Sequence, residues 1–182
     1  ELLAYAAEQV ALHRDAIRSN LEAHGVSDLD LLWPGAGYNS VACGGNYEVL
    51  RLLEREGVLR VGHIVGASGG AASAILALAD PDLGTETLLR SYMVYARWAA
   101  RTWDVQILRS APLWGAIYRR VIDSDAAFER VSWRGRVAVA AGLRFRNWVL
   151  HNFADREQCA TAYEASGEAS VTGAFRGHRI DG

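Results

Sequence analysis

Apolar residues follow two different spacings along the chain, and the change of spacing predicts a mixture of helices and strands. Across residues 1–24 they recur every three or four positions, as on one face of a helix, and Gly25 then ends the segment. Two short apolar runs, at residues 29–33 and 61–65, are instead predicted to be buried strands. A glycine-rich turn and a helical segment follow each run, which is the order expected of an α/β fold.

Residues 84–123 carry the periodicity of two helices. On the first helix, one apolar stripe is predicted to face the core, and it consists of Leu89, Met93, Ala96, Ala100 and Trp103. Arg90, Arg97 and Arg101 share another face of that helix. Arginine beside tryptophan and tyrosine on amphipathic helices also suits a membrane interface, but we favour the simpler interpretation that both helices cover the sheet.

The last third of the chain is predicted to complete the sheet. Residues 137–142 and 145–152 have the pattern of two strands joined by a short turn, as in a hairpin at a sheet edge. Asp155 followed by Gln158 resembles a capping box, which begins the next predicted helix. Residues 175–180 are predicted to form a final strand.

Together these elements predict a single domain of the three-layer α/β/α class, with a mostly parallel central sheet and helices on both faces. The chain has 182 residues, which suits one domain with a substantial core better than two. We expect an N-terminal helix over residues 1–27 and the core of the domain over residues 28–182. Because the sequence starts at Glu1 without a methionine, we expect a domain excised from a longer protein.

The composition narrows the classes of function. Hydrophobic residues make up 51% of the chain and charged residues 22%, as in a soluble globular protein. The formal net charge of -2 gives no electrostatic reason to expect a nucleic-acid partner. Cys43 and Cys159 lie far apart without C-x-x-C spacing, so we expect neither a zinc site nor a disulfide. We expect no cofactor and a cytoplasmic location.

Residues 61–80 hold the strongest chemical motif, because a strand there leads through Gly66-Ala67-Ser68-Gly69-Gly70 into an alanine-rich helix. In a G-x-S-x-G nucleophile elbow the serine occupies the strained point of the turn, and the flanking Gly66 and Gly70 avoid collisions that a Cβ would cause. Ser68 is therefore the candidate nucleophile. A glycine-rich loop without chemistry is the alternative interpretation.

A second glycine-rich turn follows the first predicted strand. Backbone N–H groups at such a turn, pointing out from a helix N-terminus, form an anion site, and here they belong to Gly35, Ala36, Gly37 and Tyr38. The anion would be a phosphate or the oxyanion of a tetrahedral intermediate, and a nearby serine nucleophile favours the oxyanion. A dinucleotide site is disfavoured, because Ser40 replaces the third glycine of G-x-G-x-x-G.

The two turns, the helix between them and the strand before Ser68 resemble the start of the patatin-like phospholipase domain. The resemblance covers about residues 29–182, since residues 152–166 resemble the helix before the family's D-G-G or D-G-A motif and Asp181 stands at that motif. It implies a Ser-Asp dyad of Ser68 and Asp181, an oxyanion hole in the first turn, and a lipid ester substrate. Contact with a membrane or lipid-droplet surface is a further expectation.

The sequence departs from this family pattern at several positions. Asn39 stands where phospholipid-cleaving members have Arg or Lys, and Ala36 replaces the middle glycine of the turn. Members of the adipose triglyceride lipase type also lack the cation, and for them the resemblance points to neutral glycerides. Ser40 and a missing proline after Ser166 leave open a second interpretation, a catalytically silent module that binds lipid or a protein partner.

A Ser-His-Asp triad is the competing catalytic interpretation. In α/β-hydrolases the chain order is serine, acid and histidine, whereas only Gly182 follows Asp181 here. His178 precedes that aspartate, so its order is wrong. The histidines without an obvious acidic partner in the sequence are His24, His63 and His151. The Ser-Asp dyad is therefore preferred.

Overall fold

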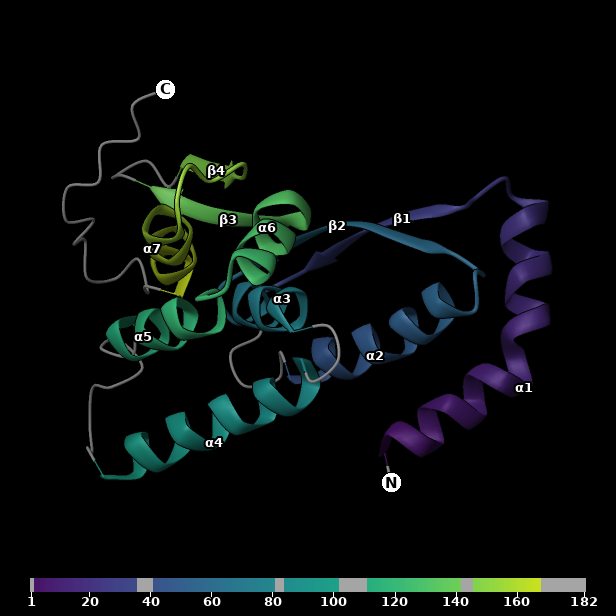
Figure 1. Ribbon diagram of the computed structural model, residues 1–182, viewed down its shortest axis with the longest axis horizontal. Coiled ribbons are helices and arrows are strands. Elements are labelled where there is room, and N and C mark those ends of the chain that lie inside the picture. The colour runs from purple at the N-terminus through teal and green to yellow at the C-terminus, as the bar shows by residue number, and fades with distance from the viewer. Residues whose placement is uncertain (1, 36–40, 81–83, 102–110, 142–145, 168–182) are drawn as a thin grey trace.

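The computed structural model describes residues 2–35, 41–80, 84–101, 111–141 and 146–167 (Figure 1). The strands in these ranges are β1 (Asp28–Trp33), β2 (Arg60–Ala67), β3 (Gly135–Ala141) and β4 (Arg146–Leu150). The helices are α1 (Leu2–Ala23), α2 (Val41–Arg55), α3 (Gly69–Ala79), α4 (Gly84–Arg101), α5 (Ala111–Val121), α6 (Asp125–Arg134) and α7 (Arg156–Gly167). None of the helices within the described ranges is both long enough and apolar enough to cross a membrane.

The strands form one sheet in the order β1-β2-β3-β4. β1 pairs with β2 and β2 pairs with β3 in parallel, whereas β3 and β4 are antiparallel. The predicted α/β class with a mostly parallel sheet is therefore confirmed, as is the antiparallel pair at its edge. Because β1, β2 and β3 run in the same direction, their C-terminal ends lie at the same edge of the sheet.

Local sequence signals mark several element ends where they were expected. Gly25 and Gly57 follow α1 and α2 with φ of +66° and +65°, the left-handed conformation in which a Cβ would be strained. Asp155 precedes α7, and its Oδ1 accepts a hydrogen bond from the backbone N–H of Gln158 at 2.7 Å. The predicted cap is therefore confirmed.

The structure contains a helix, α6, that the sequence pattern does not predict. Its N-terminal signal is Ser124, whose Oγ accepts a hydrogen bond from the backbone N–H of Ala127 at 3.2 Å. Arg130 on α6 also donates to the carbonyls of Leu78 and Ala79 at the end of α3, at 3.1 and 2.5 Å. α6 therefore satisfies carbonyls that the end of α3 leaves without a helical partner.

Helix α3 is the centre of the fold. Every residue from Gly70 to Ala79 is buried, and α3 contacts β1, β2 and β3. Helices α2, α6 and α7 each contact both α3 and the sheet, so they cover the same face of the sheet as α3 (Figure 1). The alanines of α3 allow this close approach, because a small side chain brings the helix near the strands.

The other face of the sheet is open to solvent at Leu32, which is 74% exposed. Its neighbour Trp33 contacts the ring of Tyr47 on α2, with the ring centroids 6.0 Å apart. Since successive side chains of a strand point to opposite faces, Leu32 points away from the helices. The described residues thus supply the sheet and helices over one of its faces, and a helical layer on the other face stays a prediction.

The predicted core stripe of α4 is wrong. Leu89, Met93, Ala96 and Ala100 are exposed, and Trp103 lies outside the described residues. The buried face of α4 instead carries Tyr92 and Tyr95, whose rings lie 5.1 and 5.7 Å from that of Trp114 on α5. Aromatic side chains bury more apolar area than leucine or methionine, so their packing on Trp114 determines which face of α4 turns inward.

Tyr163 on α7 continues this aromatic cluster and has a buried hydroxyl. Its ring lies 6.1 Å from the rings of Tyr118 and Phe153. The Tyr163 hydroxyl has no hydrogen-bond partner within the part of the chain that the structure describes. Burial accordingly raises the pKa of this phenol. A buried hydroxyl without a partner is a net cost to stability.

The substitution Tyr163→Phe is therefore expected to raise the free energy of unfolding by about 1 kcal/mol, because it removes the hydroxyl and keeps the packed ring. Urea denaturation followed by circular dichroism measures the change. Tyr5→Phe, at an exposed position on α1, is the matched control and is expected to change stability by less than about 0.5 kcal/mol. A destabilised Tyr163→Phe variant would show that the hydroxyl has a partner.

Candidate active site

Ser68 occupies the turn between β2 and α3. Its backbone has φ of +51° and ψ of -123°, and among the described residues only Asn152 shares a positive φ without being glycine. Such a conformation costs about 1 to 3 kcal/mol for a residue with a Cβ. The cost is tolerated where the surrounding structure fixes the residue, and here the side chain of Ser68 is exposed at the edge where β2 ends.

The glycines on either side of Ser68 have no room for a side chain. A Cβ on Gly66 would lie 2.6 Å from the Cα of Ala71, and a Cβ on Gly70 would lie 2.3 Å from the carbonyl oxygen of Trp33. Both contacts are with backbone atoms, which cannot move aside without distorting β1 or α3. The sharp turn at Ser68 therefore depends on glycine at both positions.

The start of the first glycine-rich turn, at Gly35, lies directly beside Ser68. Trp33 at the end of β1 pairs with Gly66 near the end of β2, so the two strands end at the same edge of the sheet. A Cβ on Gly35 would lie 3.2 Å from the Cβ of Ser68 and 3.9 Å from its Oγ. Gly35 thus allows the chain after β1 to pass close to the Ser68 hydroxyl.

The remaining predicted site residues lie outside the described residues. They are Ala36, Gly37, Tyr38, Asn39 and Asp181. The structure therefore brings together Gly35, Gly66, Ser68 and Gly70, and it leaves the aspartate and most of the predicted oxyanion hole as predictions.

The N-terminus of α3 points its positive end toward Ser68. α3 spans Gly69–Ala79 and has no acidic residue in its first turn. The partial positive charge of a helix N-terminus stabilises a negative charge placed near it. An oxygen anion formed beside Ser68 would experience this field.

Ser166 on α7 holds the backbone of Ser68, and the sequence gives no indication of this contact. The Ser68 backbone N–H donates to Ser166 Oγ at 2.9 Å, and Ser166 Oγ donates to the carbonyl of Ala138 on β3 at 2.6 Å. One hydroxyl therefore links α7, β3 and the strained turn. Its position 98 residues after Ser68 explains why no local pattern predicts it.

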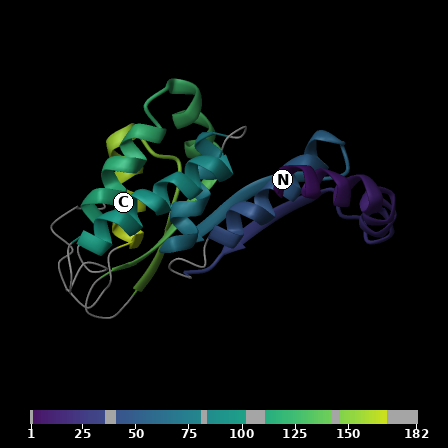
Figure 2. The same ribbon diagram turned by 90° about the horizontal axis from the view of Figure 1, so that it is seen from below.

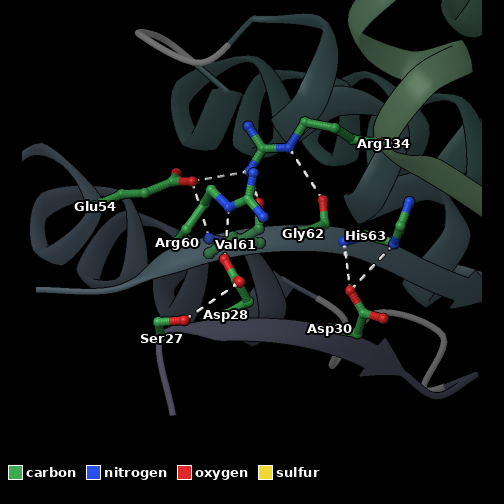
Figure 3. Close-up of polar contacts among 9 residues, drawn as sticks. All are labelled: Ser27, Asp28, Asp30, Glu54, Arg60, Val61, Gly62, His63 and Arg134. Atoms are coloured by element: carbon green, nitrogen blue, oxygen red, sulfur yellow. Dashed lines mark hydrogen bonds and ion pairs between the residues drawn. The ribbon is translucent and has the colours of Figure 1, made fainter. Parts of the chain in front are cut away.

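The expectation that His63 lacks an acidic partner is wrong. Figure 3 shows Asp30 of β1 and His63 of β2 pointing toward one another. Asp30 Oδ1 lies 2.8 Å from the backbone nitrogen of His63 and 3.2 Å from its Nδ1. The hydrogen bond from the His63 backbone N–H, followed by that from its ring, holds the pKa of Asp30 below its usual value. The irregular register between Leu29 and Leu31 explains why sequence reasoning missed this pair.

This His63–Asp30 pair does not complete a triad with Ser68. Ser68 lies five positions after His63 along an extended strand, which corresponds to about 16 Å. That distance is far beyond the hydrogen-bond reach that a general base needs.

A second polar cluster near this pair holds the sheet together. Arg134 donates to the carbonyls of Val61 and Gly62 at 2.6 and 3.3 Å, and its guanidinium also lies 3.2 Å from Glu54 (Figure 3). Glu54 in turn accepts a hydrogen bond from the backbone N–H of Val61 at 2.9 Å. These contacts are with the backbone of β2 or between Arg134 and Glu54. The cluster therefore supports the sheet and offers no reactive group.

The two cysteines do not compete with Ser68 as nucleophiles. Both are free thiols, and Cys159 is fully buried in α7. Burial raises the pKa of the Cys159 thiol to about 12, and it also raises that of Cys43. A thiol is nucleophilic only as the thiolate, so neither residue is activated.

No family model, no curated protein and no solved structure matches this chain. Its function is therefore inferred from the chemistry of the Ser68 turn.

Proposed function

We propose that the chain is a serine lipid acyl hydrolase in which Ser68 attacks an ester carbonyl. The observation that carries this proposal is the strained backbone of Ser68 in a glycine-flanked turn between β2 and the buried helix α3. The turn resembles a nucleophile elbow, in which strain keeps the serine hydroxyl exposed at the end of a strand. Glycine would adopt this φ without strain, so the serine at this position supports a role for its hydroxyl.

The proposed base is Asp181, in a Ser-Asp dyad. A serine hydroxyl is a weak nucleophile until a base accepts its proton, and the described histidine with an acidic partner, His63, is too far away. As the Ser68 oxygen bonds to the ester carbon, its proton passes to Asp181. The alcohol then leaves with that proton. Water next attacks the acyl carbon and gives a proton to Asp181, and the Ser68 oxygen takes up that proton as the carboxylic acid is released.

The oxyanion of the tetrahedral intermediate would form between the two glycine turns. Gly35 lies beside Ser68, and the proposed donors are the backbone N–H groups of Gly35, Ala36, Gly37 and Tyr38. Each well-aimed donor in such a site contributes about 3 to 4 kcal/mol to transition-state stabilisation. The N-terminus of α3 adds a favourable field at the same place.

Asn39 indicates which class of lipid ester the proposed site prefers. Because it supplies no cation in the first turn, the site has less to offer a phosphate head group, which favours neutral glycerides over phospholipids. Head-group profiling of Asn39→Arg beside the unmodified chain tests this preference. An unchanged head-group profile would contradict the inference that the missing cation favours neutral glycerides.

Hydrolysis of a chromogenic short-chain ester tests the proposed function. The unmodified chain is expected to release product, and Asp181→Asn is expected to lower kcat by on the order of 10³-fold because the Ser68 proton loses its acceptor. Asp15→Asn, at an exposed position on α1, makes the same chemical change away from the site and is expected to leave kcat unchanged. Absence of turnover in the unmodified chain would favour the silent lipid- or protein-binding module instead.

Ser166 offers a separate test of the turn. Ser166→Ala is expected to lower kcat about tenfold with little change in KM, since the strained Ser68 backbone loses its one described side-chain partner. Ser166→Thr keeps a hydroxyl and is expected to restore most of kcat. Ser124→Ala removes the N-cap of α6 and costs similar stability, about 1 kcal/mol, so it separates a loss of positioning from a loss of stability. Equal kcat values for both alanine variants would contradict the role of Ser166.

A further inference from the structure

The outer face of α4 combines exposed apolar side chains with arginines. Leu89, Met93 and Val94 are 44%, 54% and 49% exposed. Arg90 and Arg97 are exposed among them on the same helix. The opposite face of α4 is held in the aromatic cluster with α5, so the helix cannot rotate to bury these apolar residues.

An open groove of about 390 Å³ continues this face toward α5. Its apolar lining consists of Val94 from α4 and of Ala116, Ile117 and Val121 from α5. Arg90 from α4 and Arg120 from α5 also line the groove. A groove lined by apolar side chains and two arginines suits an amphipathic molecule with an anionic group.

These two helices are basic, although the net charge of the chain is -2. They contain one acidic residue, Glu86, and five arginines, which are Arg90, Arg97, Arg101, Arg119 and Arg120. Arg119 forms ion pairs with two glutamates of α7, so it is not counted as part of the exposed basic surface. Arg90 pairs with Glu86 and Arg120 with Asp123, but exposed pairs of this kind contribute little, so a phosphate can replace the carboxylate.

We propose that this surface docks on a bilayer that contains anionic phospholipids. The docking surface consists of Leu89, Arg90, Met93, Val94, Arg97 and Arg120. Its apolar side chains enter the head-group region while the arginines bind lipid phosphates, as amphipathic helices do at a membrane interface. A second copy of the chain fits less well, because a symmetric contact would oppose arginines with arginines.

Docking does not depend on whether Ser68 acts, so the inference goes beyond the proposed function. Co-sedimentation of the Ser68→Ala chain with vesicles tests it without hydrolysis of the lipid. The chain is expected to bind vesicles of phosphatidylcholine with phosphatidylserine at least tenfold more tightly than vesicles of phosphatidylcholine alone, and added salt is expected to weaken the binding. Equal binding to both vesicles, or none to either, would overturn the proposal.

Surface variants then locate the binding face. Arg97→Gln is expected to weaken binding about fivefold, and Leu89→Ser with Met93→Ser by about tenfold. The matched controls are Arg14→Gln and Leu12→Ser on α1, which lies at the far end of the molecule from α4 (Figure 2). Leu12 is 67% exposed, so it tests an apolar side chain of the same kind.

Three results would overturn the proposed docking surface. Unchanged binding by the α4 variants, or an equal loss in the α1 controls, would overturn the proposal. A dimer in the absence of vesicles that the α4 variants dissociate would assign the face to a second copy and would likewise overturn it. Because every substituted side chain on α4 is exposed, thermal unfolding is expected to stay unchanged and serves as the check on folding.

Discussion

Ser68→Ala is expected to abolish ester hydrolysis, with a fall in kcat of on the order of 10⁴-fold or more, while the fold is kept. The reason is that no other described group replaces the hydroxyl: the Cys159 thiol is buried and protonated, and His63 lies about 16 Å away. Release of product from a chromogenic short-chain ester measures the loss, and circular dichroism confirms the fold. Ser27→Ala, at an exposed serine before β1, is the control and is expected to keep full activity.

Ser68→Gly tests the backbone strain at Ser68 separately from the role of its hydroxyl. Glycine adopts a positive φ without strain, so Ser68→Gly is expected to be inactive and yet more stable than Ser68→Ala by about 1 kcal/mol. Thermal unfolding of the two variants measures the difference. Equal stabilities would argue that Ser68 is not strained, and turnover in either variant would exclude Ser68 as the nucleophile.

Gly70→Ala is expected to give the largest loss of stability, at least about 3 kcal/mol. The added Cβ would lie 2.3 Å from the carbonyl oxygen of Trp33 and 2.6 Å from that of Pro34, and neither backbone atom can move without separating α3 from β1. Since α3 is the buried centre of the fold, most of the sheet contacts depend on this approach. Urea denaturation measures the free energy of unfolding, or a chain that fails to fold shows the effect directly.

Gly45→Ala is the matched control, because it makes the same substitution inside α2 where a Cβ would meet nothing within 4 Å. It is expected to stabilise the chain by up to about 1 kcal/mol through higher helix propensity. Similar effects at both positions would contradict the tight packing of Gly70 on the end of β1.

The parts of the fold that the sequence predicts correctly have local signals. β1 and β2 are short apolar runs, and Gly25 and Gly57 end helices with positive φ. The turn at Ser68 is also predicted from a local signal, because the G-x-S-x-G pattern lies within five consecutive residues. Its catalytic role stays a prediction, as does that of Asp181.

The features that the sequence does not predict depend on contacts between distant segments. Leu88, Tyr92 and Tyr95 have the same helical spacing as Leu89, Met93 and Ala96, so periodicity alone cannot choose between the two faces of α4. Packing on Trp114 of α5 makes that choice.

The same limit applies around the sheet. The Ser166 hydroxyl reaches Ser68 only because α7 packs beside β3, and Asp30 reaches His63 only because the register of β1 shifts. Neither contact has a signature in the neighbouring residues.

Covalent labelling of Ser68 tests the central claim most directly. A serine-directed fluorophosphonate is expected to modify the unmodified chain with one equivalent, and mass spectrometry of the tryptic peptide between Arg60 and Arg90 is expected to place the adduct on Ser68. The same reagent is expected to leave Ser68→Ala unlabelled. An unreacted Ser68, or an adduct on Ser73 of the same peptide, would contradict the claim that this turn presents an activated nucleophile.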